Sequence, residues 1–85
     1  MAHFVYIIQS SADGTYYVGS TQDVDNRLKR HNQGRSQYTK PKRPWNLVYF
    51  EEYSNKSDAI KRENSIKRRK NKRFIESLIE AFSSA

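Results

Sequence analysis

The stretch from Tyr16 to His31 places the strongest constraint on the fold, because it passes from a strand-forming run into an amphipathic helix. Gly19 lies between the two, and Asp23 is suited to cap the helix at its N-terminus. Spacings of three and four residues then place four side chains on one helix face: Val24, Arg27, Leu28 and His31. Two basic side chains therefore share a stripe that should be buried, where an unpaired charge costs several kcal/mol.

The helix alone leaves two interpretations of Arg27 and His31 open. In the first, Arg27 lies at the edge of the stripe with its charged end in water, and His31 binds carbonyl groups near the helix end. In the second, an anionic group meets both side chains, which lie i,i+4 apart and are neighbours on the helix surface. The residues of the preceding strand favour the second interpretation.

Length and composition exclude several classes of protein. With 85 residues the chain is expected to form a single domain, residues 1–85, around a small core. It has no cysteine and two histidines, His3 and His31, so disulfides and thiolate or histidine metal sites are not expected. No apolar run is long enough to span a membrane, and the N-terminus lacks the pattern of a signal peptide. The sequence therefore predicts a soluble, cytoplasmic protein that does not bind membranes.

The net charge of +7 indicates a polyanionic partner. Eight of the sixteen Lys and Arg residues lie between Lys61 and Arg73. Nucleic acid is favoured over a membrane surface because no apolar face accompanies this basic run. Two alternatives remain, in which the charge serves only solubility or matches an acidic protein within an assembly.

Three strands are predicted at residues 4–8, 15–19 and 45–53, which are rich in β-branched and aromatic residues. The third should be central in its sheet, because its middle is apolar without interruption. Asp13-Gly14 is a favoured pair for a two-residue hairpin turn, so the first two strands are expected to form a hairpin.

That turn predicts which residues of the hairpin face each other. Tyr6 would face Thr21, and Tyr17 would face Ser10. Because side chains alternate between the two faces of a strand, both tyrosines should project to the same side. The residues expected on this shared face are Phe4, Tyr6, Ile8, Tyr17 and Gly19.

Three helices are predicted from capping residues and apolar spacing. The first follows Asp23 and ends at a left-handed cap on Gly34. The other two are expected from Ser57 or Asp58 to about Arg69, and from Asn71 through Phe82. Residues 35–44, which hold both prolines and four basic residues, should form an exposed loop before the third strand.

Glu63 is an acidic residue on the inward face of the second helix, three residues from both Ile60 and Ile66. An i,i+4 salt bridge to Lys67 is the simplest interpretation of such a residue. The residues expected near Glu63 favour a different interpretation. An inward carboxylate, an inward arginine and histidine, and two tyrosines on one face could together form a site that cuts a phosphodiester bond.

The ordered motifs resemble the GIY-YIG nuclease domain over about residues 3–75, and in particular its small stand-alone bacterial members. The stretch from Tyr38-Thr39 to Arg43-Pro44-Trp45 also resembles those small members. The motif residues in chain order are Phe4-Val5-Tyr6, Tyr17-Val18-Gly19, Arg27 and His31 on the next helix, and Glu63 after the third strand.

The resemblance implies an α+β domain in which about three helices flank a three-stranded antiparallel sheet, and it implies metal-dependent endonuclease activity on DNA. In that family the glutamate, here Glu63, binds a divalent cation such as Mg²⁺ or Mn²⁺. Arg27 would contact the scissile phosphate, and Tyr6 or Tyr17 would activate water. Other branches carry a lysine where this chain has Ser20, so activation of the tyrosine would depend on His31 or Arg27.

DNA is the expected partner, with a role in DNA repair or recombination. Selectivity would come from DNA structure or from a protein partner, or binding would be non-specific. An alternative of another class is a non-catalytic nucleic-acid-binding module on the same scaffold, with Tyr38 or Trp45 as stacking surfaces. The residues expected to bind nucleic acid are Arg35, Tyr38, Lys40, Lys42, Arg43, Lys67 and Arg68.

Overall fold

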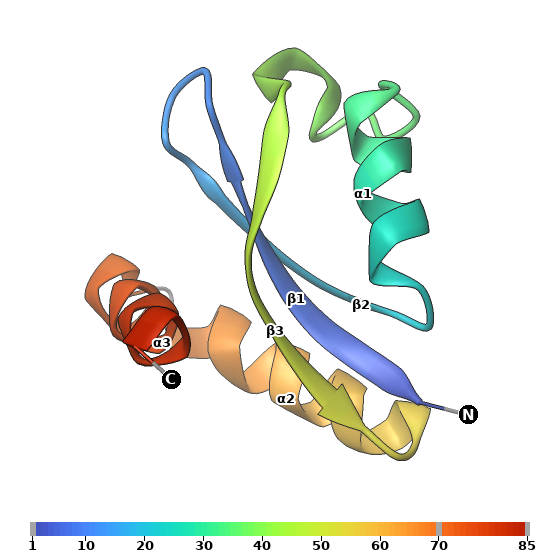
Figure 1. Cartoon of the computed structure of the whole chain (residues 1–85), viewed down its shortest axis with the longest axis vertical. Coiled ribbons are helices and arrows are strands. Elements are labelled where there is room, and N and C mark those ends of the chain that lie inside the picture. Colours follow the sequence, from blue (N-terminus) through green and yellow to red (C-terminus); the bar gives the residue numbers. More distant parts are fainter. Residues whose placement is uncertain (1, 70, 85) are drawn as a thin grey trace.

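The computed structural model of the chain describes residues 2–69 and 71–84, and within them three strands and three helices form an α+β fold, as predicted. The sheet is antiparallel, with strand order β2-β1-β3 (Figure 1). The elements are β1 (His3–Ser10), β2 (Tyr16–Thr21), α1 (Val24–Asn32), the short 3-10 helix η1 (Lys40–Lys42), β3 (Trp45–Tyr53), α2 (Lys56–Arg69) and α3 (Lys72–Ser84).

The prediction of a central third strand is wrong, because β1 lies between β2 and β3. Residues 5–8 of β1 are all buried, as a strand covered on both faces requires. On β3 the burial is partial, and Phe50 is 40% exposed although it belongs to the apolar run. An uninterrupted apolar run therefore does not distinguish a central strand from an edge strand whose outer residues stay partly in water.

Two apolar clusters lie on opposite faces of the sheet, because successive side chains of β1 point to opposite sides. On one face Val5 and Ile7 pack against α2 and α3. On the other face Tyr6 and Ile8 pack against Trp45 and the apolar residues of α1. Figure 1 shows α1 apart from the other two helices, and the sheet separates them.

The hairpin between β1 and β2 has a different register from the predicted one. Tyr6 faces Gly19 and Tyr17 faces Ile8, so both predicted pairs are wrong. The reason is a four-residue loop: Ser10 N donates to Thr15 O at 2.8 Å, and the Ser10 hydroxyl accepts hydrogen bonds from two backbone N–H groups of the loop. The shift is by two residues, which preserves the faces, so Tyr6 and Tyr17 still share one side.

The ends of α1 agree with prediction. Asp23 is the N-cap, and its carboxylate accepts a hydrogen bond of 3.0 Å from Asn26 N. Gly34 has φ +79°, and its N–H donates to His31 O while Arg35 N donates to Arg30 O, the bonding of a Schellman motif. These two caps fix the length of α1, and therefore place His31 in its last turn.

The second helix begins earlier than predicted, at Lys56. Asn55 supplies the capping oxygen, which accepts a hydrogen bond of 2.8 Å from Asp58 N, so neither Ser57 nor Asp58 is the cap. Asn71 precedes α3 as predicted, and its side-chain oxygen accepts from Arg73 N at 2.9 Å. Among residues 2–69 and 71–84, no helix is both long and apolar enough to cross a bilayer.

Candidate functional site

Tyr6, Tyr17 and His31 form an aromatic group on the α1 face of the sheet. The ring centroids of Tyr17 and His31 are 5.1 Å apart, and those of Tyr6 and Tyr17 are 6.4 Å apart. Trp45 closes the group on the β3 side, with its ring 6.4 Å from that of Tyr17. Three elements that are distant in sequence thus bring the two motif tyrosines and the helical histidine together.

Gly19 explains how Tyr6 fits into this group. The two residues face each other across the hairpin, and the Tyr6 ring lies over the glycine backbone. A Cβ atom on residue 19 would be 2.5 Å from Tyr6 Oη and 2.7 Å from Cζ, well inside contact distance. The absence of a side chain at this position therefore provides the space for the tyrosine ring.

A chain of hydrogen bonds runs from Tyr6 through His31 to Thr39. Tyr6 Oη lies 3.0 Å from His31 Nε2, and His31 Nδ1 lies 2.8 Å from Thr39 Oγ1. All three residues are buried, with 3%, 3% and 0% of their surface exposed. Sequence reasoning did not find Thr39, which it had placed in an exposed loop. Its position eight residues after His31 gave no signal that the side chain turns inward.

The loop that carries Thr39 is anchored to the sheet and to α1. The Trp45 indole N–H donates to Thr39 O at 2.8 Å. The Asn32 side chain accepts from Trp45 N at 2.6 Å and donates to Trp45 O at 3.0 Å. The prediction of an exposed loop over residues 35–44 therefore holds for Tyr38, which is 60% exposed, and fails for Thr39.

Burial sets the protonation of the two buried groups at neutral pH. Burial and then Tyr17 raise the pKa of Tyr6 well above its ordinary value, with Arg27 acting in the opposite direction. Burial and then the charge of Arg27 lower the pKa of His31. Tyr6 is therefore a neutral phenol and His31 a neutral imidazole, and the hydrogen bond between them joins an acid to a base.

Arg27 is half-buried on α1, as the spacing of its helix predicted. Its charge lowers the pKa of His31 and, against the effect of burial, acts to lower that of Tyr6. A guanidinium in this position presents several N–H donors in a planar fork that matches the oxygens of a phosphate.

Glu63 approaches the same group from α2. Its carboxylate accepts a hydrogen bond of 2.6 Å from Lys67, so the i,i+4 ion pair left open by the sequence is present. The Lys67 ammonium also lies 6.0 Å from the ring centroid of Tyr17, and Glu63 acts electrostatically on Tyr6. Glu63 thus belongs to the surroundings of the tyrosines as well as to an ion pair on its own helix.

Glu63 is the carboxylate of the candidate site that could bind a hydrated divalent cation, and its partner in the structure is Lys67. Groups of three or more His, Asp or Glu side chains that could share a metal ion do not occur within residues 2–69 and 71–84. Mg²⁺ keeps several waters and is commonly held by one or two carboxylates together with substrate phosphates. The Glu63 side chain is 16% exposed, so it is accessible to such an ion if Lys67, which is 46% exposed, moves aside.

The basic residues predicted to bind DNA lie on two surfaces. Lys67 and Arg68 are on α2, where they line a hollow of about 540 Å³ with Lys61 and Asn64. Because Lys67 also reaches the Tyr17 ring, this basic surface leads directly to the aromatic group.

The remaining predicted basic residues lie on the loop after α1, and some of them hold the fold together. Lys42 Nζ is 3.5 Å from the Asp13 carboxylate, and Arg43 donates to Lys40 O at 2.9 Å. Arg35 and Lys40 are exposed. Because Lys42 and Arg43 have partners within the chain, they are less available for phosphate contacts than the sequence indicated.

Tyr38 extends the aromatic group to the surface. Its ring centroid is 5.9 Å from that of Tyr17, and Lys42 Nζ lies 5.9 Å from the Tyr38 centroid. An exposed aromatic ring beside a cation suits stacking on an unpaired base.

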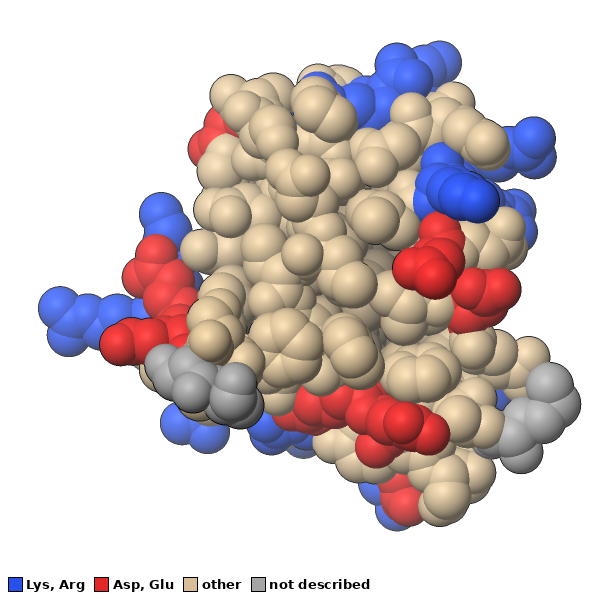
Figure 2. Space-filling view, viewed as in Figure 1, with Lys and Arg blue, Asp and Glu red and all other residues tan. Residues whose placement is uncertain are grey.

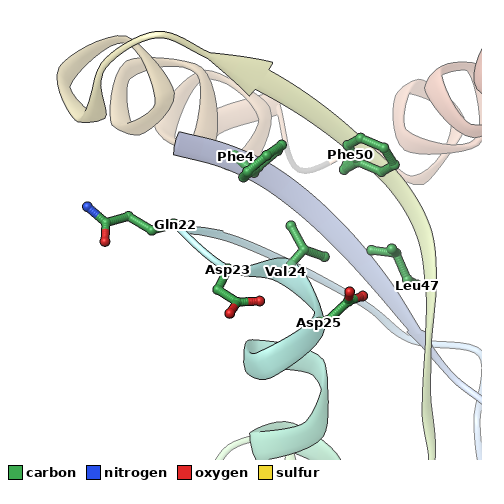
Figure 3. Close-up of a pocket in the computed structure, with 7 residues that line it drawn as sticks. All are labelled: Phe4, Gln22, Asp23, Val24, Asp25, Leu47 and Phe50. Atoms are coloured by element: carbon green, nitrogen blue, oxygen red, sulfur yellow. The ribbon is translucent and has the colours of Figure 1, made fainter. Parts of the chain in front are cut away.

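A different hollow, of about 340 Å³, opens beside the start of α1 (Figure 3). Phe4, Val24, Leu47 and Phe50 line it, and Figure 3 shows the carboxylates of Asp25 and of Asp23, the residue that caps α1, close by. Figure 2 shows acidic side chains over the start of α1 and the end of β3, with uncharged surface between them. Carboxylates repel phosphate, so this face is not suited to DNA.

Comparison with known proteins gives a consistent result. The family model described as the GIY-YIG catalytic domain matches residues 2–76. UPF0213 proteins of Staphylococcus aureus strains Mu3 and N315 are each 51% identical over 67 residues, which is 78% of this chain and 80% of theirs.

The solution NMR structure of the UPF0213 protein BH0048 from Bacillus halodurans has the same fold. The TM-score is 0.60 at 35% sequence identity, over 95% of this chain and 85% of that chain. The similarity therefore extends through the sheet and the helices that carry Tyr6, Tyr17, Arg27 and Glu63.

Proposed function

The chain belongs to the GIY-YIG family, and from this membership we propose that it is a metal-dependent endonuclease that hydrolyses DNA phosphodiester bonds. The family is one of catalytic domains, and the small bacterial relatives resemble this chain over most of its length. The proposed residue roles are supported by the hydrogen bond between Tyr6 and His31, and by the charges of Arg27 and Glu63, which both act on Tyr6.

The observation that carries the proposal is the hydrogen bond between Tyr6 and His31. Hydrolysis requires that a proton be taken from water, and a phenol directed at a neutral imidazole supplies a route for that proton. The raised pKa of Tyr6 means that a free phenolate is not formed at neutral pH. Tyr6 therefore relays a proton: it accepts one from water while it donates its own to His31.

In the proposed step the water oxygen bonds to phosphorus as one P–O ester bond breaks, while the water proton passes to Tyr6 Oη and the Tyr6 proton passes to His31 Nε2. The departing ester oxygen takes a proton from solvent water, and His31 then returns its extra proton to the hydroxide that is left. Arg27 binds the non-bridging phosphate oxygens, on which negative charge develops, and so stabilises the transition state more than the substrate.

Glu63 is the residue that would hold the divalent cation, Mg²⁺ or Mn²⁺. Such an ion supplies Lewis-acid stabilisation of the phosphate and of the departing oxygen. Lys67, once released from Glu63, is positioned to contact the DNA backbone together with Arg68.

The DNA surface in this proposal is the basic side of α2 together with the loop after α1. DNA is recognised by its structure, or without selectivity, unless a protein partner adds specificity. A role in DNA repair or recombination and a cytoplasmic location complete the proposal. The assignment of Arg35, Lys40 and Arg68 as phosphate contacts follows from their exposure.

The alternative function is a non-catalytic nucleic-acid-binding module. It is supported by Tyr38, whose exposed ring lies next to that of Tyr17. Under this alternative the same basic surfaces bind single-stranded or distorted DNA, and Tyr6 and His31 serve only the core.

A nicking assay on branched, single-stranded and duplex DNAs separates the two functions. The wild-type chain is expected to cut at least one of these DNAs in Mg²⁺ or Mn²⁺ and none in chelator. Tyr6→Phe keeps the ring and loses the hydroxyl, and it is expected to bind as wild type while nicking falls about 100-fold or more. Tyr53→Phe, which removes a hydroxyl on the edge strand, is the matched control. Binding without any metal-dependent nicking would establish the alternative.

A further inference from the structure

We propose that Thr39 is a positioning residue, whose hydroxyl group holds His31 in the tautomer that carries its proton on Nδ1. Nε2 then faces Tyr6 as a hydrogen-bond acceptor. The catalytic consequence rests on the proposed nuclease function, but the tautomer itself does not.

The donors and acceptors of the buried chain favour this arrangement. If Nδ1 carries the proton, it donates to Thr39 Oγ1 at 2.8 Å, and the Thr39 hydroxyl donates to Ser36 O at 3.5 Å. The Tyr6 hydroxyl then donates to Nε2 at 3.0 Å. All three protons have acceptors, as buried polar groups require.

The other tautomer leaves this chain incomplete. With the proton on Nε2, the imidazole donates to Tyr6 Oη, and the Thr39 hydroxyl must turn to donate to Nδ1. Ser36 O keeps Lys40 N as a donor at 2.9 Å, but the buried Tyr6 proton loses His31 as its acceptor. Leaving a buried donor without an acceptor is unfavourable enough to favour the first tautomer at least several-fold.

Thr39 is held firmly enough to impose this choice. Its carbonyl oxygen accepts from Trp45 Nε1 at 2.8 Å and from Lys42 N at 3.1 Å. Its side chain is fully buried, and Trp45 is itself 2% exposed. The backbone of Thr39 is therefore fixed by the strand that follows, and the hydroxyl can rotate but not move away from the imidazole.

The tautomer of His31 determines whether the Tyr6 proton can move to Nε2 in the reaction. Nε2 can accept the Tyr6 proton only if it carries none. With the wrong tautomer, Nε2 already bears a proton, and Tyr6 has no base to receive its own. Thr39 touches neither substrate nor metal in this account, and acts only through His31.

A simpler interpretation is that Thr39 is a buried residue that fills space. In that case valine, which has the same shape without the hydroxyl, would serve as well. Serine, which keeps the hydroxyl and loses a methyl group, would be the worse substitute.

The test measures the tautomer of His31 by ¹⁵N NMR at about pH 8, where an imidazole of ordinary or lowered pKa is neutral. The variants are Thr39→Val and Thr39→Ser, with Thr15→Val on the hairpin as the matched control. Wild type, Thr39→Ser and the control are expected to carry the proton on Nδ1. Thr39→Val is expected to shift it partly or wholly to Nε2.

The same variants are compared in the nicking assay. Thr39→Val should lower turnover by about 10- to 100-fold, the range for groups that orient a functional histidine, with DNA binding unchanged. Thr39→Ser should restore most of the activity.

Two results would overturn the inference. One is a wild-type His31 that carries its proton on Nε2, which can be observed even if Thr39→Val does not fold. The other is a Thr39→Val protein with an unchanged tautomer. If the tautomer behaves as expected but no variant cuts DNA, the proposed function fails and the positioning role of Thr39 stands.

Discussion

Replacing Gly19 with alanine tests whether the hairpin shapes the site as described. The new Cβ would lie 2.5 Å from Tyr6 Oη and 2.7 Å from Cζ, whereas ordinary contact begins at 3.4 Å. The Tyr6 ring must therefore move by roughly 0.7–0.9 Å, or the strands must separate. The φ angle of Gly19 is not in the left-handed region, so alanine adds no backbone strain.

The structure gives an expected magnitude for this change. Tyr6 is 3% exposed and packs between Gly19 and the cluster that contains Ile8 and Trp45, so the ring has little room to move. Overpacking of this kind costs about 1–3 kcal/mol of unfolding free energy. A displacement of nearly 1 Å also disturbs the hydrogen bond to His31, and misplacement on that scale lowers turnover by up to about 100-fold.

Urea denaturation and the nicking assay measure the two effects. Gly14→Ala is the control, because φ at Gly14 is +77° and the nearest atom to its Cβ, on Gln9, is 4.0 Å away. It should cost about 1–2 kcal/mol through backbone strain alone and leave the site intact.

A double-mutant cycle isolates the contact. Gly19→Ala should lose most of its cost when Tyr6 is also changed to alanine, which gives a coupling energy of about 1–3 kcal/mol. A coupling energy near zero would refute the argument that Gly19 is there to make room for Tyr6.

Three further outcomes are expected. Arg27→Lys keeps the charge but loses the planar fork, so nicking should fall about 100-fold while DNA binding is nearly unchanged. Wild-type turnover in this variant would mean that Arg27 only lies at the edge of the buried helix face, with its charged end in water. DNA affinity should fall steeply with salt, because phosphate contacts dominate, and a flat log–log plot would contradict this. Although burial opposes it, hydrogen bonds led by the one from Arg62 lower the pKa of Glu51. The ionised Glu51 carboxylate should therefore stabilise the fold fully above the unfolded-state pKa of about 4.3, and this stabilisation should be lost as pH falls through the folded-state pKa. Denaturation of Glu51→Gln should not show that loss.

The parts of the fold that depend on local signals could be predicted from the sequence. Asp23 and Gly34 cap α1 as expected, and the helical period placed His31 on the buried face. The alternation of side chains placed Tyr6 and Tyr17 on one side, even though the register was wrong, because the error was an even number of residues.

The parts that depend on distant contacts could not be predicted. Ser10 lengthens the hairpin loop through its own side chain, a choice that the Asp13-Gly14 pair does not reveal. Thr39 is buried because Trp45 and His31 hold it, and both contacts form only when the loop returns to the sheet. Residues 1, 70 and 85 of the predicted single domain lie outside the described residues, and its extent stays a prediction.

The most direct test of the proposed nuclease concerns Glu63. Glu63→Gln keeps the size and helix propensity of the side chain and removes the charge that would hold a divalent cation. Glu76→Gln, an exposed change on α3, is the matched control. Both proteins are compared with wild type for folding, for DNA binding without metal, and for nicking in Mg²⁺ and Mn²⁺.

Glu63→Gln is expected to fold, to bind DNA at least as tightly as wild type, and to show almost no nicking, while Glu76→Gln is expected to cut normally. The tighter or equal binding is expected because the substitution removes a carboxylate that repels phosphate. If Glu63 served only its ion pair with Lys67, the substitution would change stability by less than about 1 kcal/mol and leave nicking unchanged. That result would contradict both the metal-binding role of Glu63 and the mechanism proposed for this chain.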